Sequence, residues 1–201
     1  MAMYVKKYGV SNFDSQDLTA IVKRSWAIEL CNDLIKRDLD TTWQMPTGTR
    51  SEVFDEEVVD LLYKSGCRLL SFAPESGSKE ILLDMKKQID LEKLFESIRI
   101  ARRRGFKISC FIVIGFPTES PDTLKMTMKL IRKFAIMGVH DITVSKFVPY
   151  PGSVMFHKLL DEGKIHLNDE FLLSPMDLYT SNAPSYADQI PSKLLYRTML
   201  W

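Results

Sequence analysis

Residues 107–119 read KISCFIVIGFPTE, and this stretch decides the fold of the chain. Seven of the eight residues in 108–115 are apolar or small, and Ser109 is the one polar side chain among them. An apolar run this short, ended by glycine and proline, predicts a strand buried on both faces, as in a parallel sheet. Residues 120–122, SPD, then predict the start of a helix. Because ligands of α/β proteins gather at this end of the strands, we expect the turn 115–119 to lie beside any small ligand.

The same alternation of strand and helix extends through the chain. Predicted strands cover residues 4–13, 41–45, 68–73, 107–115 and 142–148. A helix pattern follows each strand, and the first is expected to be capped by Asp17 and to carry an apolar stripe from Leu18 to Leu34. Pro46 is expected to end the second strand and to open a loop. This cadence predicts an α/β fold with an open parallel sheet of about five βα units and an exposed edge at its first strand.

The periodicity fades after Ile165, and three prolines interrupt what remains. We therefore expect residues 1–165 to form the core and residues 166–201 to form a C-terminal extension, truncated at its end.

Composition excludes several classes of protein. The chain has 201 residues and a net charge of +1, so charge does not favour binding to nucleic acid or to anionic lipid. No run approaches the roughly 20 apolar residues of a membrane span. A cytoplasmic location is the expectation.

Six short motifs follow one another along the chain. They are WQMPTGTR (43–50), GC (66–67), APESGS (73–78), MKK (85–87), IGFPTE (114–119) and PYPGS (149–153). In this order and spacing they resemble the radical S-adenosylmethionine (SAM) superfamily, in the branch that usually carries a cobalamin-binding domain and includes enzymes similar to the anaerobic magnesium-protoporphyrin ester cyclase. The resemblance covers about residues 8–165. It implies a partial (β/α)6 TIM-like barrel that lacks its first unit, with SAM lying across the C-terminal edges of the strands.

The resemblance implies ten SAM contacts: Thr49, Arg50, Glu75, Ser76, Lys87, Gly115, Phe116, Pro117, Val148 and Pro149. Glu75 would hold the ribose hydroxyls, beside Ser76, since a carboxylate can accept both hydroxyl hydrogens. Lys87 would meet the methionine carboxylate as a point charge. Thr49 and Arg50 would handle the amino-acid end of SAM.

The remaining implied contacts surround the adenine. Gly115 would let the backbone approach the ring, and Phe116 and Pro117 would supply an apolar face. Val148 and Pro149 would flank the ring on the other side.

Simpler roles are open for several of these residues. Glu75 could cap the helix that follows it, and Lys87 could be a solvated lysine near a helix end. Arg50 could pair with Glu52 or Asp55. The turn residues 115–117 could do no more than shape the turn.

The chain departs from the superfamily in its cysteines. The superfamily uses a CxxxCxxC motif, whose three thiolates hold a [4Fe–4S] cluster. Here Cys31, Cys67 and Cys110 lie 36 and 43 residues apart, a spacing that indicates buried thiols and no metal site. We therefore expect no catalytic or metal-ligating residues in this chain.

The leading hypothesis is that the chain is the SAM-binding portion of a radical SAM enzyme. The complete protein would cleave SAM reductively, or would use SAM with cobalamin for methyl transfer, and this chain alone would not. The cluster, and cobalamin through a missing N-terminal domain, would belong to the full-length protein. A missing N-terminal segment or a partner would cover the edge of the first strand.

Two alternatives stay open from the sequence. One is a degenerate, noncatalytic radical SAM-like module that binds a partner through its open edge. The other is a metal-independent (β/α) enzyme such as an aldolase, for which Lys146 is the one lysine near a strand end.

Overall fold

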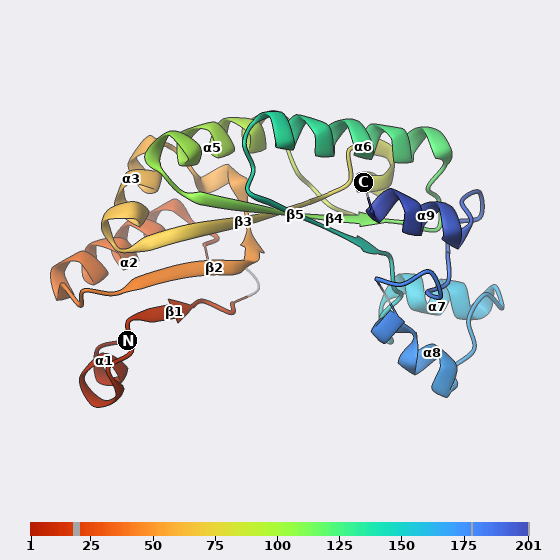
Figure 1. Ribbon diagram of the computed structural model, residues 1–201, viewed down its shortest axis with the longest axis horizontal. Coiled ribbons are helices and arrows are strands. Elements are labelled where there is room, and N and C mark those ends of the chain that lie inside the picture. The colour runs from red at the N-terminus through yellow and green to blue at the C-terminus, as the bar shows by residue number, and fades with distance from the viewer. Residues whose placement is uncertain (18–20, 178, 201) are drawn as a thin grey trace. The chain divides into compact units, whose positions relative to one another are not determined.

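The computed structural model describes residues 1–17, 21–177 and 179–200 (Figure 1). The strands are β1 (Asn12–Asp14), β2 (Thr42–Thr49), β3 (Cys67–Glu75), β4 (Lys107–Ile114) and β5 (Asp141–Lys146). The helices are α1 (Ala2–Tyr8), α2 (Arg24–Arg37), η1 (Ser51–Val53), α3 (Glu56–Lys64), α4 (Lys79–Asp84), α5 (Leu91–Arg104), α6 (Pro121–Ile136), α7 (Val154–Asp161), α8 (Asp169–Leu173), η2 (Ser174–Asp177) and α9 (Ser192–Met199). Among the described residues, no helix is both long and apolar enough to cross a bilayer.

The strands form one sheet in the order β1-β2-β3-β4-β5. β1 pairs with β2, and β2 with β3, in parallel register, with Phe13 opposite Trp43 and Trp43 opposite Cys67. The predicted α/β fold with an open parallel sheet of five strands is confirmed. Within the described residues β1 is an edge strand.

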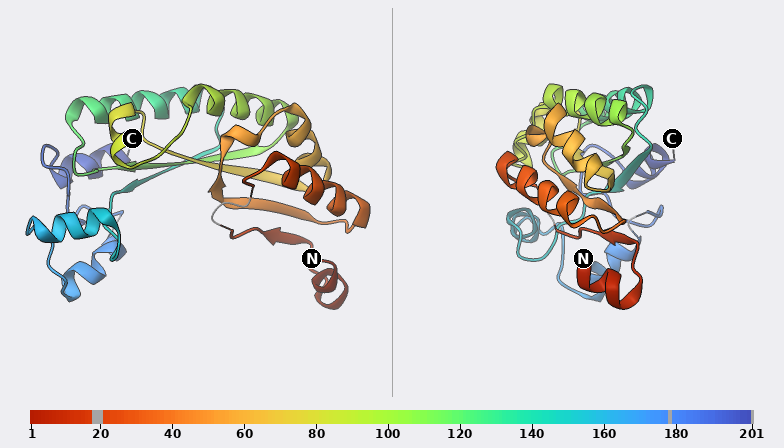
Figure 2. Two further views of the ribbon diagram at one scale, coloured as in Figure 1. Left: turned by 180° about the vertical axis from the view of Figure 1, so that it is seen from behind. Right: turned by 90° about the vertical axis from the view of Figure 1, so that its left-hand side faces the viewer.

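The chain divides into two compact units. The first comprises Met1–Pro74, Ile89–Phe111 and Ile131–Thr143, and the second comprises Glu75–Gln88, Ile112–Leu130 and Val144–Trp201. In the first unit α2, α3 and α5 lie side by side (Figures 1 and 2). They bury residues such as Leu62 and Ile98, which are fully inaccessible to solvent.

Most of the predicted helix starts are confirmed, because the capping side chains take the expected partners. Asp55 Oδ1 accepts from Val58 N at 2.9 Å at the start of α3. Ser78 caps α4, and Asp90 caps α5 by accepting from Glu92 N and Lys93 N. α6 begins at Pro121 as expected.

The prediction of a strand over residues 4–13 is wrong for most of its length. Ala2–Tyr8 is helical, and only Asn12–Asp14 pairs with the sheet. Gly9, at φ 65°, ends the helix in the left-handed conformation, and its N–H bonds to Val5 O at 2.9 Å. No residue of α1 is buried, so the apolar residues of this segment do not mark the buried face of a strand.

The first long helix begins later than predicted. α2 starts at Arg24, and Leu18, the first residue of the predicted stripe, lies outside the described residues. The buried face carries Ala27 and Cys31, whereas Trp26 is 45% exposed. Arg24 pairs with Asp55 at 2.7 Å, which ties the start of α2 to the cap of α3.

Pro46 does not end the second strand as predicted. β2 continues to Thr49, and its pairing with β3 shifts register between Met45 and Thr49. Proline lacks an N–H for the ladder, and such a shift is where a strand tolerates it. Gly48, at φ 95°, lies inside the irregular section.

Residues beyond Ile165 contribute to a small apolar cluster in the second unit. Phe171 and Tyr186 pack there with Phe156, Leu159 and Ile165. The extension 166–201 therefore supplies part of the packing around α7 and carries α8 and α9.

A buried lysine holds the segment that leads to α9. Lys146, at the end of β5, is 3% exposed. Its Nζ donates to Thr180 O at 2.8 Å, Ala183 O at 3.2 Å and Ser192 Oγ at 3.1 Å. These three acceptors are neutral, and burial lowers the pKa of the ammonium. Because the three donors of the ammonium all have partners, it serves as a fixed anchor for residues 180–192.

Replacing Lys146 by Met should release that anchor. The variant keeps the apolar stem but leaves three acceptors without their donor, so we expect a loss of about 2 kcal/mol in the free energy of unfolding. Hydrogen exchange should accelerate in residues 180–192 more than elsewhere. Lys193→Met, at an exposed position on α9, is the control. Equal stability and exchange in the two variants would contradict the anchoring role.

The turn after β4 is closed by its own acid. Gly115 has a φ of 81°, a left-handed conformation that glycine adopts without strain. Glu119, 1% exposed, accepts through Oε2 from Gly115 N, and its N–H bonds to Phe116 O at 2.8 Å. Burial raises the pKa of Glu119 from 4.5 to about 7, against the opposing effect of its bonds to the turn amides.

This shifted pKa predicts a pH dependence of stability. The unfolded chain releases the Glu119 proton near pH 4.5, whereas the folded chain keeps it to about pH 7. The folded state therefore binds more protons between these values, and stability should fall as the pH rises through that window, by about 3 kcal/mol from this group.

Chemical denaturation of the wild type and of Glu119→Gln across the same pH range measures this effect. The Gln variant keeps an acceptor for Gly115 N but has no titrating group, so its stability should depend less on pH. If the free energy of unfolding changed equally with pH in both proteins, the raised pKa of Glu119 would be contradicted.

Candidate functional site

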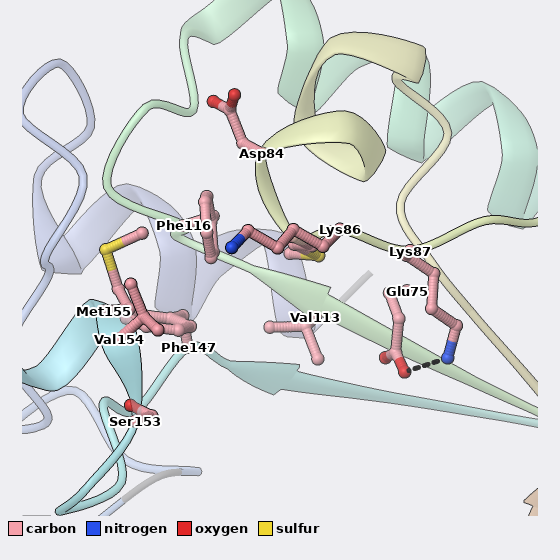
Figure 3. A pocket seen from close by; sticks show the side chains of 11 residues that line it. Glu75, Asp84, Lys86, Lys87, Val113, Phe116, Phe147, Ser153, Val154 and Met155 are labelled. Atoms are coloured by element: carbon pink, nitrogen blue, oxygen red, sulfur yellow. Dashed lines mark hydrogen bonds and ion pairs between the residues drawn. The ribbon is translucent and has the colours of Figure 1, made fainter.

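A hollow of about 410 Å³ lies in the second unit (Figure 3). It is lined by Glu75, Asp84, Met85, Lys86, Lys87, Val113, Phe116, Phe147, Ser153, Val154 and Met155. Three strand ends contribute to it, because Glu75 ends β3, Val113 is near the end of β4 and Phe147 directly follows β5. The volume is within the range of small-molecule sites.

One wall of the hollow is polar. Lys87 Nζ and Glu75 Oε1 form an ion pair at 3.0 Å, and their side chains are 37% and 22% exposed (Figure 3). Glu75 has a φ of 66°, which is uncommon for a residue other than glycine. Residues held in such backbone conformations are frequent at functional sites.

The opposite wall is apolar and aromatic. The rings of Phe116 and Phe147 meet edge to face with centroids 4.9 Å apart, and Val154 and Met155 lie beside Phe147 (Figure 3). Phe147 N also bonds to Ile114 O at 2.7 Å, which fixes the start of this wall to the end of β4. A hollow with one charged wall and one aromatic wall suits a ligand that has both a polar end and a flat apolar ring.

The loop after α4 is tied to the turn after β4. Thr118 Oγ1 donates to Asp84 Oδ2, and Lys87 N bonds to Leu82 O at 2.8 Å. These bonds set the direction of residues 84–87, which form one rim of the hollow.

Only some of the predicted site residues line the hollow. Glu75, Lys87 and Phe116 line the hollow together. Gly115 and Pro117 are buried in the adjoining turn, and the space above the Gly115 Cα is filled by Leu195 of α9, whose Cδ1 would lie 2.6 Å from an added Cβ. The structure does not place Gly115 in the wall of the hollow.

Ser76 is buried and its hydroxyl is already engaged. Its Oγ lies 3.0 Å from Thr127 Oγ1 and accepts from Ser78 N at 3.1 Å. Val148 is half-buried and Pro149 is buried, both directly after Phe147, and neither lines the hollow.

Thr49 and Arg50 belong to the first unit. Thr49 ends β2 with a buried Oγ1 that has no hydrogen-bond partner among the described residues. Arg50 is exposed and precedes η1. Within the described part of the chain Arg50 forms no ion pair with Glu52 or with Asp55. Asp55 is paired with Arg24 instead.

Two of the simpler alternatives are also decided. Glu75 does not cap the following helix, because Ser78 takes that role. Lys87 lies beyond the end of α4 and is ion-paired with Glu75.

The sequence reasoning missed Lys86, Phe147, Val154 and Met155, which also line the hollow. Phe147 had a signal, since it lies near the end of the predicted strand 142–148, and it directly follows the observed β5. Lys86 had a weaker one, because it is adjacent to the predicted Lys87 and nothing in the sequence distinguishes the two.

The residues present do not fit a [4Fe–4S] cluster. Cys31, Cys67 and Cys110 are fully buried and unbonded to one another, on α2, β3 and β4. Burial raises the thiol pKa of Cys31 to about 11 and that of Cys110 to about 12, and raises that of Cys67 as well. Iron is held by thiolates, so these thiols are unsuited to it. Among residues 1–17, 21–177 and 179–200, no three His, Cys, Asp or Glu side chains form a metal-binding group.

Curated proteins similar to this chain are considerably longer. An anaerobic magnesium-protoporphyrin IX monomethyl ester cyclase from Rubrivivax gelatinosus is 27% identical over 162 residues, which are 80% of this chain and 28% of that protein. A cytidylyl-2-hydroxyethylphosphonate methyltransferase from Streptomyces wedmorensis is 33% identical over 112 residues, 55% of this chain and 21% of that protein. The chain thus spans less than a third of either relative.

Solved structures show the same fold. The radical S-adenosylmethionine methyltransferase TsrM from Kitasatospora setae, solved with cobalamin and a [4Fe–4S] cluster bound, superposes with a TM-score of 0.69 at 19% identity, over 80% of this chain and 32% of that one. This similarity confirms that the sheet is part of a TIM-like barrel.

The sequence model of the radical SAM superfamily matches residues 24–131, which is more than half of the chain. That stretch contains β2, β3 and β4 and the Glu75, Lys87 and Phe116 side chains of the hollow. The chain belongs to the radical SAM superfamily.

Proposed function

We propose that the hollow binds SAM, and that this chain is the SAM-binding portion of a radical SAM enzyme. The observation that supports this most strongly is the meeting of Glu75, Lys87 and Phe116 in one hollow, because these residues come from three separate sequence motifs. The charged wall suits the ribose and amino-acid end of SAM, and the aromatic wall suits the adenine ring.

Each side chain would contribute through ordinary interactions. Glu75 would accept hydrogen bonds from the ribose hydroxyls, with Lys87 holding one of its oxygens. Phe116 would cover one face of the adenine. The resemblance to the superfamily implies that Lys87 meets the methionine carboxylate, and Lys87 would then bind both the ligand and Glu75.

The remaining predicted contacts are part of the same proposal. Thr49 and Arg50 stay in the proposal, for the amino-acid end of SAM, on the sequence resemblance alone. Val148 and Pro149 would bound the adenine side. Gly115 and Pro117 would shape the turn, and Ser76, through its bond to Thr127, would fix the backbone beside Glu75.

Radical SAM proteins use SAM and a [4Fe–4S] cluster, and the described residues of this chain include no metal-binding group for the cluster. For the complete protein we propose reductive cleavage of SAM or SAM/cobalamin-linked methyl transfer, in keeping with relatives named as methyltransferases and a cyclase. The same relatives favour an enzyme portion over a noncatalytic module. Cobalamin would be held outside this chain, as would the cluster.

The partners and location stay predictions. Nearly balanced charge argues against nucleic acid, and the edge of β1 offers a place for a preceding segment or a partner strand. A cytoplasmic location agrees with three free thiols.

Replacing Glu75 by Gln tests the proposed site. The variant keeps the shape of the side chain but loses the charge that strengthens its hydrogen bonds to the ribose, so SAM should bind about 10-fold more weakly. Isothermal titration calorimetry with the purified chain measures this.

The control is Glu80→Gln, an exposed position on α4 in the same unit. It should bind SAM like the wild type, and both variants should melt within a few degrees of it. Undiminished binding by Glu75→Gln would place the ribose elsewhere.

A further inference from the structure

The loop that presents Glu75 to the hollow is fastened to α6. Thr127, near the middle of that helix, is fully buried, and so is Ser76. Thr127 Oγ1 lies 3.0 Å from Ser76 Oγ and accepts from Gly77 N at 3.1 Å. One hydroxyl group of the helix therefore holds the two residues that directly follow Glu75.

The donors and acceptors of this contact balance. Thr127 Oγ1 donates to Thr123 O at 3.3 Å, along its own helix. The Ser76 hydroxyl then donates to Thr127 Oγ1, while its own oxygen accepts from Ser78 N at 3.1 Å. A threonine hydroxyl has one proton and two lone pairs, and here all three have partners. A buried polar cluster that is fully satisfied makes the backbone it holds rigid.

The main chain of the loop also lies directly against α6. A Cβ added to Gly77 would be 2.5 Å from Met126 O and 2.9 Å from Thr127 Cα. Glycine permits so close an approach of two main chains because it has no Cβ. The position of the loop is thus set by α6 along its length and by the Ser78 cap of α4 at its end.

Glu75 needs this support. Its φ is 66°, a conformation that is unfavourable for a residue with a Cβ and that persists where the surroundings hold it. In that conformation Oε1 lies 3.0 Å from Lys87 Nζ in the wall of the hollow (Figure 3). Without the Thr127 hydroxyl, Gly77 N would lose a partner and the loop would relax toward commoner backbone angles. The carboxylate would then leave its position in the hollow.

We propose that Thr127 is a positioning residue for the ligand of the hollow and acts through Glu75. Because Thr127 has no exposed surface, it cannot touch the ligand itself. The inference rests on the proposed function of the hollow, and it adds to the site a residue of α6 that none of the sequence motifs contains. Ligand affinity then depends on a hydroxyl group that lies outside the cavity.

The test measures SAM affinity in a double-mutant cycle. Titration calorimetry gives the dissociation constant for the wild type, Thr127→Val, Glu75→Ala and the double variant, with melting temperatures to show that each is folded. Valine keeps the shape of threonine but removes the hydroxyl, whereas Thr127→Ser retains the hydroxyl and tests rescue. Thr198→Val is the matched control, because the Thr198 hydroxyl also donates within its own helix, to Leu194 O at 2.9 Å.

Thr127→Val should bind SAM about 10-fold more weakly, and Thr127→Ser should bind within about 3-fold of the wild type. The double variant should be about as weak as Glu75→Ala alone, because the valine acts through a carboxylate that the alanine has already removed. Two independent effects would instead multiply, so that the double variant would be about 10-fold weaker than Glu75→Ala. Thr198→Val should bind like the wild type.

Wild-type affinity in Thr127→Val, or multiplied losses in the double variant, would overturn the inference and leave the proposed function standing. If Thr127→Val does not fold, Ser76→Ala takes its place in the cycle, and undiminished binding by that variant would also overturn the inference. No binding of SAM by the wild type would refute the proposed function, and the inference with it.

Discussion

Parallel strands release their outgoing turns at one edge of a sheet, and the candidate site depends on this constraint. In the second unit the last residue of β3, a residue near the end of β4 and the first residue after β5 line one hollow. Pairing of the strands in chain order is enough to bring Glu75, Val113 and Phe147 together, because they lie at the ends of neighbouring strands. Polar side chains at one strand end and aromatic side chains at the next two then give the hollow its two unlike walls.

The parts of the fold that could be predicted are those that a local pattern determines. β4 is a short, continuous apolar run closed by glycine, and its length and ends could be predicted from the sequence. The helix starts at Asp55, Ser78 and Asp90 could also be predicted, because a capping side chain accepts a hydrogen bond from a backbone N–H within three residues of itself.

The misses have a common physical origin in contacts that local pattern does not encode. α1 buries no residue, so its apolar side chains carried no information about a face. Pro46 is tolerated in β2 because the register with β3 shifts there, which is a property of two strands. The sequence indicates only that Lys146 is near a strand end. Its partners, the carbonyl oxygens of Thr180 and Ala183, are brought to it by the folded C-terminal segment. In the site, motif positions identified Glu75 and Lys87, but the direction of Lys86 depends on a left-handed residue that sequence does not reveal.

The central claim is that SAM occupies the hollow of the second unit, and methyl NMR of the purified chain tests it most directly. With methionine and valine methyl groups labelled, titration with SAM should shift the signals of Val113, Val154 and Met155, which line the hollow, and leave that of the buried Met45 in the first unit unchanged. Saturable shifts confined to residues outside the hollow, with these three unmoved, would contradict the account.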